Sequence, residues 1–345
     1  MSAADKEQRG TRSSAPTGLV ALTEDLESVI AAIRACPALE LVGQAGMPQA
    51  DALPDLPWFD DPRVLITDTR VQAVVLATST RGDTELAATA VANDVHVWRR
   101  PPMGRNFAEA AEVAGLVKRQ ATVYDVASWW AHVADPAWNE LNWPDGFEPT
   151  FSEIRVSAPG PPEESWRRSA RDTAGGALAN DGYALLEALV ATRSFPESAA
   201  AAVGTYRADR NTTPNAEDTA LAMLRYADGG IASVRVTWDL SPTAHELIHH
   251  GRRATASLTM EDVTLLNAAG EMHDQRPVPS PFLAASLQRF AEYVRVDARD
   301  RAAVSVDRHL AVSAILETIY LAARTNHPEA PRKLYEVQGW PAPMP

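Results

Sequence analysis

The sequence predicts an α/β protein in two parts: a doubly wound domain on a parallel sheet, then an α+β domain on a large, mostly antiparallel open sheet. Three observations support this. The chain has 345 residues, which is more than one typical domain of about 150 residues. Apolar strands alternate with helices as far as Asp125. Beyond residue 150, strand patterns and turn signals such as Asp228-Gly229-Gly230 prevail.

Residues 1–16 are polar, without the apolar stretch of a signal peptide or anchor, so we expect a disordered tail there. An apolar strand is expected over 18–22. Thr23 is the expected N-cap of the helix that follows, because hydroxyl side chains favour that position. Pro37 ends this helix, and a second strand is expected over 39–42.

The run VQAVVLAT, residues 71–78, is continuously apolar, as in a strand buried on both faces of a parallel sheet. In the same half we expect helices over 83–93 and 106–119, and strands over 95–98 and 121–126. In the second half we expect strands over 151–158, 220–227, 231–239 and 255–267, and helices over 176–191, 283–296 and 306–324. The predicted domains are residues 17–127 and 128–345.

Composition excludes several classes of protein. The formal net charge is −13, which disfavours nucleic-acid binding, and no apolar run approaches the ~20 residues that cross a bilayer. One cysteine, Cys36, excludes a disulfide framework. With no export signal we expect a cytoplasmic protein. The chain has only three lysines, Lys6, Lys118 and Lys333, so few positions could supply a catalytic amine.

An ordered set of segments resembles the Gfo/Idh/MocA oxidoreductase family (glucose–fructose oxidoreductase, inositol dehydrogenase and relatives). It comprises VQAVVLATST, HVWRRPP, WRRSARDTAGGALANDGYALLEALV, EDTALAMLRYADGGIASVRVTW and the segment from SLQRF to LAART. The resemblance implies a Rossmann domain followed by a sheet domain. It also implies NAD(P)-dependent oxidation or reduction of sugars and related compounds, and oligomers formed through the sheet.

The family's cofactor positions are changed in this sequence. Where its G-x-G-x-x-G loop binds the diphosphate, the gap-free alignment places Ala21, Thr23 and Leu26. Glu24 and Asp25 stand beside them, and carboxylates repel a phosphate at a helix N-terminus. Where the family's acid binds the ribose, this chain has Gly46. We therefore expect no NAD(P) binding in the family's manner.

The family's catalytic positions are changed as well. HVWRRPPM places Pro101 at the lysine of the family's E-K-P motif, and a one-residue slip offers Arg100, which cannot shuttle a proton. In the family's D-x-G-x-H-x-x-D helix the histidine position holds Ala184. The first and last acids correspond to Asn180 and Glu187. The remaining acid–base candidates are Asp181, Tyr183 and Glu187.

A ligand pocket is still expected, and its candidate residues, taken from the resemblance, are Trp98, Arg100, Trp166, Arg167, Asn180 and Tyr183. The motif H-E-x-x-H at His245–His249 spells a zinc-protease signature. The resemblance places it on a strand, where residues i and i+4 lie ~13 Å apart. We therefore expect no metal site.

Three interpretations follow. The first is a pseudo-oxidoreductase that acts as a binding, regulatory or assembly subunit, as a homo-oligomer or with an active relative. The second is a repurposed non-redox enzyme acting on a small sugar-like or acidic metabolite. The third is a divergent NAD(P)-dependent oxidoreductase. No nucleic-acid or membrane partner is expected.

Overall fold

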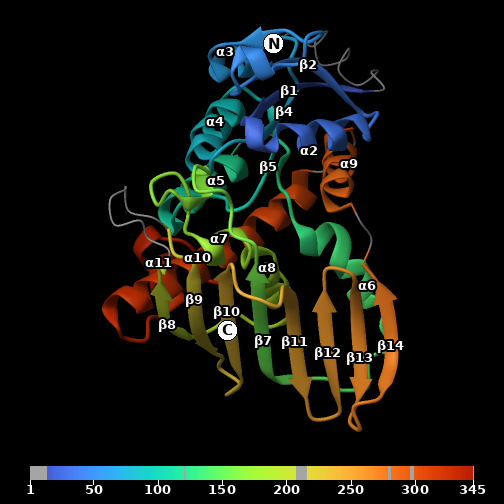
Figure 1. The fold of residues 1–345 in the computed structure, drawn as a ribbon, viewed down its shortest axis with the longest axis vertical. Coiled ribbons are helices and arrows are strands. Elements are labelled where there is room, and N and C mark those ends of the chain that lie inside the picture. Colours follow the sequence, from blue (N-terminus) through green and yellow to red (C-terminus); the bar gives the residue numbers. More distant parts are fainter. Residues whose placement is uncertain (1–13, 120–121, 207–215, 279–280, 296–298, 345) are drawn as a thin grey trace. The chain divides into compact units, whose positions relative to one another are not determined.

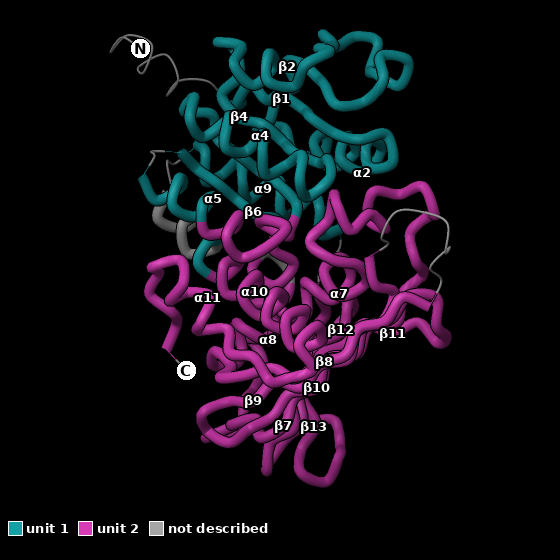
Figure 2. Tube along the Cα trace, turned by 90° about the vertical axis from the view of Figure 1, so that its left-hand side faces the viewer, with its two compact units in different colours: residues 1–100, 112–127, 281–307 teal, residues 101–111, 128–280, 308–345 magenta. Residues whose placement is uncertain are grey.

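A computed structural model describes residues 14–119, 122–206, 216–278, 281–295 and 299–344 (Figure 1). Residues 1–13 of the predicted tail lie outside this range. The chain forms two compact units, coloured in Figure 2. Unit 1 comprises residues 1–100, 112–127 and 281–307, and unit 2 comprises residues 101–111, 128–280 and 308–345. Within the described residues, no helix is both long and apolar enough to cross a membrane.

The sheet of unit 1 has six parallel strands in the order β3-β2-β1-β4-β5-β6. This is the doubly wound order of a Rossmann domain, in which ligands bind where the strand order reverses, here between β1 and β4. The strands are β1 (Ala15–Ala21), β2 (Leu39–Ala45), β3 (Trp58–Phe59), β4 (Ala73–Ala77), β5 (His96–Arg99) and β6 (Tyr124–Val126). The predicted parallel sheet is therefore confirmed.

The helices of unit 1 bury an apolar face against this sheet. Helix α2 (Thr23–Arg34) buries residues at helical spacing, among them Leu26, Val29 and Ile33. Helix α9 (Phe282–Arg295) returns from far along the chain, and its Ser286 accepts a hydrogen bond from the indole of Trp98 at 2.9 Å. The other elements are η1 (Gln49–Asp51), α3 (Pro62–Ile66), α4 (Thr80–Ala92) and α5 (Phe107–Arg119), of which α5 contributes to both units.

Unit 2 is built on an eight-stranded sheet in the order β14-β13-β12-β11-β7-β10-β9-β8. Among the described residues, β7 and β10 pair in parallel and the other strand pairs of this sheet are antiparallel. The strands are β7 (Pro149–Ala158), β8 (Ser198–Gly204), β9 (Thr219–Arg225), β10 (Ile231–Trp238), β11 (Ala244–Gly251), β12 (Ala254–Thr259), β13 (Asp262–Asn267) and β14 (Met272–Pro277). The predicted large, mostly antiparallel sheet is confirmed.

Two predicted elements of unit 2 are divided in the structure. The strand predicted over 255–267 is a hairpin, β12 and β13, which turns at Met260-Glu261. The helix predicted over 176–191 breaks at Asp181-Gly182 into α7 (Ala177–Asn180) and α8 (Tyr183–Thr192). The remaining helices are η2 (Trp130–Ala134), α6 (Asp135–Asn139), η3 (Trp166–Arg168), α10 (Arg299–Thr325) and α11 (Pro331–Gln338), of which α10 contributes to both units.

Candidate functional site

The turn from β1 into α2 holds the three positions at which the family has glycine. Ala21 ends β1 and is fully buried, Thr23 is the first residue of α2, and Leu26 packs into the core. The predicted N-cap at Thr23 is wrong: Leu22 holds that position, and no side chain caps the helix. The Thr23 hydroxyl instead donates to Asp51 Oδ2 at 2.9 Å. The turn therefore has no glycine to bring its backbone close to a diphosphate.

An ion pair joins this turn to the end of β5. Arg100 Nη1 and Nη2 donate to Asp25 Oδ1 and Oδ2, each at 2.6 Å. The Asp25 side chain is 8% exposed and that of Arg100 is 21% exposed. Since β4 lies between β1 and β5 in the sheet, the pair bridges the carboxyl end of β4. The ion pair thus occupies the edge where a doubly wound sheet binds its ligand.

Further charges lie beneath the pair. Asp83, in the first turn of α4, is buried and accepts hydrogen bonds from the Thr78 amide at 2.8 Å and the Thr78 hydroxyl at 2.7 Å. Burial raises the pKa of Asp83, while Arg99 and Arg100 oppose the rise. Burial lowers the pKa of Arg100, but the hydrogen bond and charge of Asp25 leave that pKa above its usual value. Arg100 is therefore a fixed cation.

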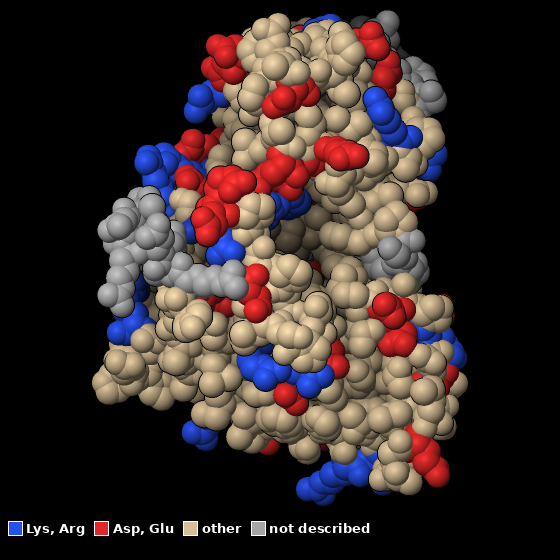
Figure 3. All heavy atoms as spheres, in the orientation of Figure 1, with Lys and Arg blue, Asp and Glu red and all other residues tan. Residues whose placement is uncertain are grey.

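Acidic side chains gather on part of the face of unit 1 that is turned toward the viewer in Figure 3 (upper half). Glu24, next to Asp25 in the first turn of α2, is exposed and contributes another carboxylate. A helix N-terminus attracts anions through its amides and its dipole. Two carboxylates in that turn reduce the attraction for a phosphate.

The end of β2 carries no acid for a ribose. Gly46 stands there with φ +91°, a backbone conformation that side chains rarely adopt. A Cβ at this position would lie 2.9 Å from the Ala21 carbonyl oxygen and 3.1 Å from a methyl carbon of Val20. The close approach of the β2 end to β1 therefore requires glycine.

Two other candidates lie near the end of β5. Trp98 is fully buried in the core of unit 1 and donates its indole N–H to Ser286. It is therefore a packing residue, and no face of its ring is open to a ligand. Pro101, at the family's lysine position, follows Arg100 and belongs to unit 2.

In unit 2 a polar cluster forms at the break between α7 and α8. Asp181 Oδ2 accepts a hydrogen bond from the Trp238 indole at 2.6 Å, and the Asp181 carbonyl accepts one from His245 Nε2 at 3.3 Å. Trp129 contacts the His245 ring edge-on, with centroids 6.2 Å apart. Asp181 is the C-cap of α7, with right-handed helical dihedral angles, and its amide donates to the Ala177 carbonyl at 2.9 Å.

The cluster holds a neutral base beside a carboxyl group. Since Nε2 donates to a carbonyl, Nδ1 of neutral His245 presents a lone pair, and it has no hydrogen-bond partner among the described residues. Burial lowers the pKa of His245, against the hydrogen bond and charge of Asp181. Burial raises the pKa of Asp181, against the hydrogen bond from Trp238 and the charges of His245 and Arg167. Such opposed shifts suit acid–base chemistry.

Asn180 holds the turn before α7. Its amide nitrogen donates to the carbonyls of Gly175 and Gly176, at 3.0 and 2.8 Å. Glu217 accepts from the Gly176 and Leu178 amides, at 2.6 and 3.1 Å, and so stabilises the same turn. Asn180, which was predicted to contact a ligand, thus donates its side-chain N–H groups to the backbone of the protein.

Tyr183 and Glu187, the other acid–base candidates, are buried on α8. The Tyr183 hydroxyl lies 2.8 Å from His309 Nδ1, and their rings stack. Glu187 accepts a hydrogen bond from Ser128, and Arg308 Nη1 lies 3.8 Å from its Oε1. Burial raises the pKa of Glu187 to about 7, against the Ser128 and Arg308 interactions. Both residues are 1% exposed, so neither presents its side chain to a ligand on the surface.

Trp166 and Arg167, both partly exposed, lie on η3. The Arg167 guanidinium lies 4.8 Å from the centroid of the Trp166 ring, and its charge reaches Asp181. The Trp166 indole nitrogen is buried without a hydrogen-bond partner in the described part of the chain. Of these two predicted pocket residues, Arg167 is therefore close enough to Asp181 for its charge to act on that carboxyl group.

The H-E-x-x-H segment lies on strand β11, as expected. His249 is buried between Ser152 and Thr192, whose hydroxyls lie 2.8 Å from its two ring nitrogens. Burial, then the charges of Arg193 and His250, lowers its pKa to about 3. His245 and His249 thus have separate surroundings, and in the described residues no group of three or more His, Cys, Asp or Glu side chains could hold a metal ion.

The sequence alone did not predict two of the contacts between side chains far apart in the chain. Asp25 and Arg100 are 75 residues apart, and Asp181 and His245 are 64 apart. One signal existed for the first: β1 and β5 of a parallel sheet end at the same edge, so charged residues just after each strand can meet. For the second, the H-E-x-x-H motif is a signature of zinc binding by two histidines, so it gave no indication that His245 alone contacts Asp181.

Parts of the sequence and the fold are similar to known proteins. Residues 148–257 match the GFO/IDH/MocA C-terminal domain. The fold is similar to levoglucosan dehydrogenase in complex with NADH and levoglucosan, with a TM-score of 0.75 and 15% identity over 92% of this chain and 99% of that one. It is also similar to aldose-aldose oxidoreductase from Caulobacter crescentus, complexed with glycerol, with a TM-score of 0.75 and 16% identity over the same shares.

A third solved structure is the 3-ketoreductase KijD10 from Actinomadura kijaniata, in complex with NADP and TDP-benzene. Its TM-score is 0.78 at 16% identity, over 90% of this chain and 98% of that one. The search of curated proteins found no match. The chain shares the fold of these oxidoreductases, and residues 148–257 match the C-terminal domain of the GFO/IDH/MocA family.

Proposed function

We propose that this chain is a pseudo-oxidoreductase of the Gfo/Idh/MocA family that does not bind NAD(P) in the family's manner and acts as a binding or assembly subunit. The observation that carries the proposal is the Asp25–Arg100 ion pair across the carboxyl edge of the parallel sheet. A dinucleotide at that edge needs glycines, amides and a ribose acceptor. The chain presents Ala21, Thr23 and Leu26 at the glycine positions, two carboxylates beside the amides of the first turn, and Gly46 at the position of the ribose acceptor.

Electrostatics support the proposal. A diphosphate at the α2 N-terminus would meet the carboxylates of Glu24 and Asp25, and like charges at a few ångströms repel. Arg100 could attract the diphosphate only by giving up Asp25. Removing one partner of a buried ion pair costs about 3–5 kcal/mol, which is comparable to the whole free energy of millimolar binding, about 4 kcal/mol.

A calorimetric titration with NAD⁺, NADH, NADP⁺ and NADPH tests the proposal. We expect no binding at millimolar nucleotide. A dissociation constant near 10 μM for any of the four would contradict it and restore the interpretation as a divergent NAD(P)-dependent oxidoreductase. The Glu27→Gln variant, altered at an exposed carboxylate later on α2, is a matched control for Glu24→Gln. If repulsion in the first turn matters, only Glu24→Gln strengthens residual binding.

The sheet of unit 2 offers a surface for assembly. Leu221 and Met223 on β9, Ile231 on β10 and Phe151 on β7 lie on one face of the sheet by their register and are 37–55% exposed. Contiguous exposed apolar side chains mark protein interfaces. We expect an oligomer in light scattering, as a homo-oligomer or with an active relative. A Leu221→Glu/Met223→Glu variant should dissociate it, and a monomeric wild type that retains no relative would contradict the assembly role.

A second candidate function rests on the Asp181–His245 cluster. A partly buried carboxyl group beside a neutral imidazole can transfer protons in a non-redox reaction on a small sugar-like or acidic metabolite. The partly exposed Arg167 would attract an acidic substrate. Turnover without nicotinamide that is lost in Asp181→Asn and kept in Tyr183→Phe favours this function, because Tyr183 is buried away from solvent.

A further inference from the structure

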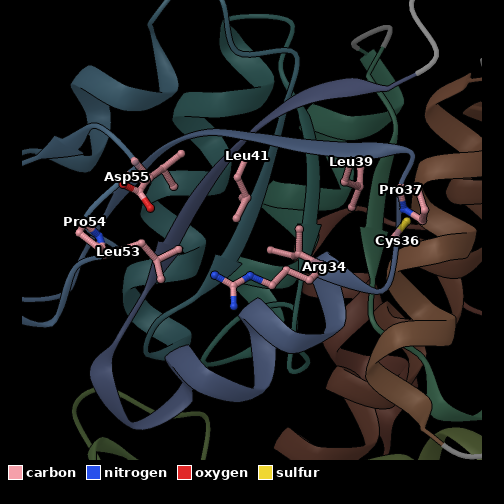
Figure 4. A pocket seen from close by; sticks show the side chains of 10 residues that line it. Arg34, Cys36, Pro37, Leu39, Leu41, Leu53, Pro54 and Asp55 are labelled. Atoms are coloured by element: carbon pink, nitrogen blue, oxygen red, sulfur yellow. The ribbon is translucent and has the colours of Figure 1, made fainter.

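Unit 1 contains an apolar cavity of about 320 Å³ between α2, β2 and the segment that precedes β3 (Figure 4). Leu39 and Leu41 of β2 line it on one side, Ile33 at the end of α2 on another, and Leu53 and Leu56 on the third. Leu39 and Leu41 point to the same face of the sheet because they are two residues apart on a strand. The volume falls in the range of small-molecule sites, about 300–1,000 Å³.

Neither Asp25 nor Arg100 of the ion pair described above lines this cavity. Leu39 opens β2, and Ile33 and Arg34 end α2, so these residues lie toward the amino end of β2. The Asp25–Arg100 pair lies at the opposite end of α2 and at the carboxyl ends of the strands. A ligand in the cavity therefore requires no change in the ion pair.

Two charged side chains border the apolar lining. Arg34 extends from the last turn of α2 toward Leu53, with its guanidinium near the middle of the space, and Asp55 lies on the far side (Figure 4). Both are exposed, and neither has an ion pair or a side-chain hydrogen bond within the described residues. They also do not pair with each other. Arg34 therefore keeps its N–H donors available next to an apolar surface.

We propose that this cavity binds a small amphiphilic monocarboxylate, with its apolar chain against Leu39, Leu41 and Leu53 and its carboxylate on Arg34. Arginine presents a planar fork of donors that matches a carboxylate. Asp55 disfavours a second anionic group at the opposite end of the ligand. The leucine lining favours an unbranched or aromatic body over a polyol, since a sugar's hydroxyls would lack partners there.

Calorimetry with octanoate, octylamine and 1-octanol tests this. Octanoate should bind one site per chain, and the other two about tenfold more weakly, since a hydrogen bond to a charged group contributes about 1.5–3 kcal/mol. Arg34→Gln should weaken octanoate about tenfold and leave octanol unchanged. Arg63→Gln, an exposed arginine on α3, is the matched control and should change nothing.

A second variant tests the location. Leu41→Trp fills the cavity and should abolish binding of all three compounds; its thermal transition shows whether it is folded. Equal affinity for octanoate and octanol, or octanoate binding unaffected by Arg34→Gln, would overturn the role of Arg34. Tighter binding of octylamine would assign the polar contact to Asp55. Several weak sites per chain, insensitive to Leu41→Trp, would show adventitious binding and refute the site.

Discussion

The carboxyl edge of the parallel sheet in unit 1 and the α7–α8 break in unit 2 differ in how fully their polar side chains are paired. At the first, Asp25 and Arg100 satisfy each other in a two-point ion pair. At the second, Asp181 is held by an indole, and His245 Nδ1 has no hydrogen-bond partner in the described residues. Polar groups that satisfy each other have little capacity left for a ligand, whereas a buried group without a partner gains from one.

The two regions differ in what holds their polar groups together. The ion pair needs only one acid in the first turn of α2 and one arginine after β5. Both positions lie where the resemblance expects cofactor contacts. The Asp181 cluster instead rests on a break in a helix, which brings a backbone carbonyl and a carboxylate to His245 and Trp238.

The largest expected effect is on the ion pair itself. Arg100→Ala removes the two-point ion pair from the Asp25 carboxylate, which is 8% exposed in the wild type, so we expect a loss of about 4 kcal/mol in the free energy of unfolding. Urea denaturation measures it. Arg63→Ala, at an exposed site, should change the same quantity by less than about 0.5 kcal/mol. An equal effect of the two variants would show that the pair contributes nothing.

Glu187 should make unit 2 less stable as the pH rises. Its pKa is about 7 when folded and 4.5 as its ordinary value. Between these values the folded state holds a proton that the unfolded state releases, so the free energy of unfolding falls as pH rises, by about 1.4 kcal/mol per pH unit and about 3 kcal/mol in all. Glu187→Gln should lack this fall.

The difference between wild type and Glu187→Gln, measured by denaturation from pH 4.5 to 8, isolates this contribution. Glu27→Gln, an exposed substitution, is the control. A wild type and Glu187→Gln with parallel pH profiles would refute the interpretation of Glu187 as a buried acid.

Restoring the family's ribose acid should disrupt the protein rather than create a cofactor site. Gly46→Asp places a side chain at φ +91° and 2.9 Å from the Ala21 carbonyl oxygen. Strain of this kind costs about 1–3 kcal/mol. We expect a lower melting temperature and no gain in NAD⁺ affinity. Gly270, also at positive φ but with open space around its Cβ position, gives the control Gly270→Asp.

The smallest effect concerns the Asp181 cluster. The carboxylate of Asp181 acts against the fall in the pKa of His245. Asp181→Asn should therefore lower that pKa further, with a loss of about 1 kcal/mol in stability from the weaker bond to Trp238. An NMR titration of the His245 ring measures the shift. A pKa that rises or stays unchanged would show that the two groups are not coupled.

Local patterns were enough to predict the two sheets. The apolar run at 71–78 and the helices beside it are short-range signals, so the parallel sheet could be predicted from residue order. The hairpin at Met260-Glu261 was missed because neither residue is a typical turn former. Helix α9 was predicted as a helix, but its return to unit 1 depends on contacts across nearly 200 residues, as between Trp98 and Ser286.

The part of the candidate site that the sequence could predict was the set of positions whose residues differ from the family's motifs. Positions 21, 23, 26 and 46 could be checked one at a time against known motifs. The ion pair between Asp25 and Arg100 at the carboxyl edge of the sheet could not be predicted in this way. It follows from the fold and not from either sequence segment. In the same way, Trp98 was assigned to a pocket by analogy and proves to be core, since burial is a property of the packed unit.

The central claim is that the Asp25–Arg100 pair holds the dinucleotide edge closed, and NMR tests it most directly. The amide signals of residues 22–26 and the guanidinium signal of Arg100 would be followed as NADPH or NADH is added to 5 mM, a concentration at which a millimolar ligand is largely bound. If the ion pair excludes the dinucleotide, none of these signals moves. Saturable shifts of Arg100 together with the amides of α2 would show a nucleotide at this edge and contradict the account.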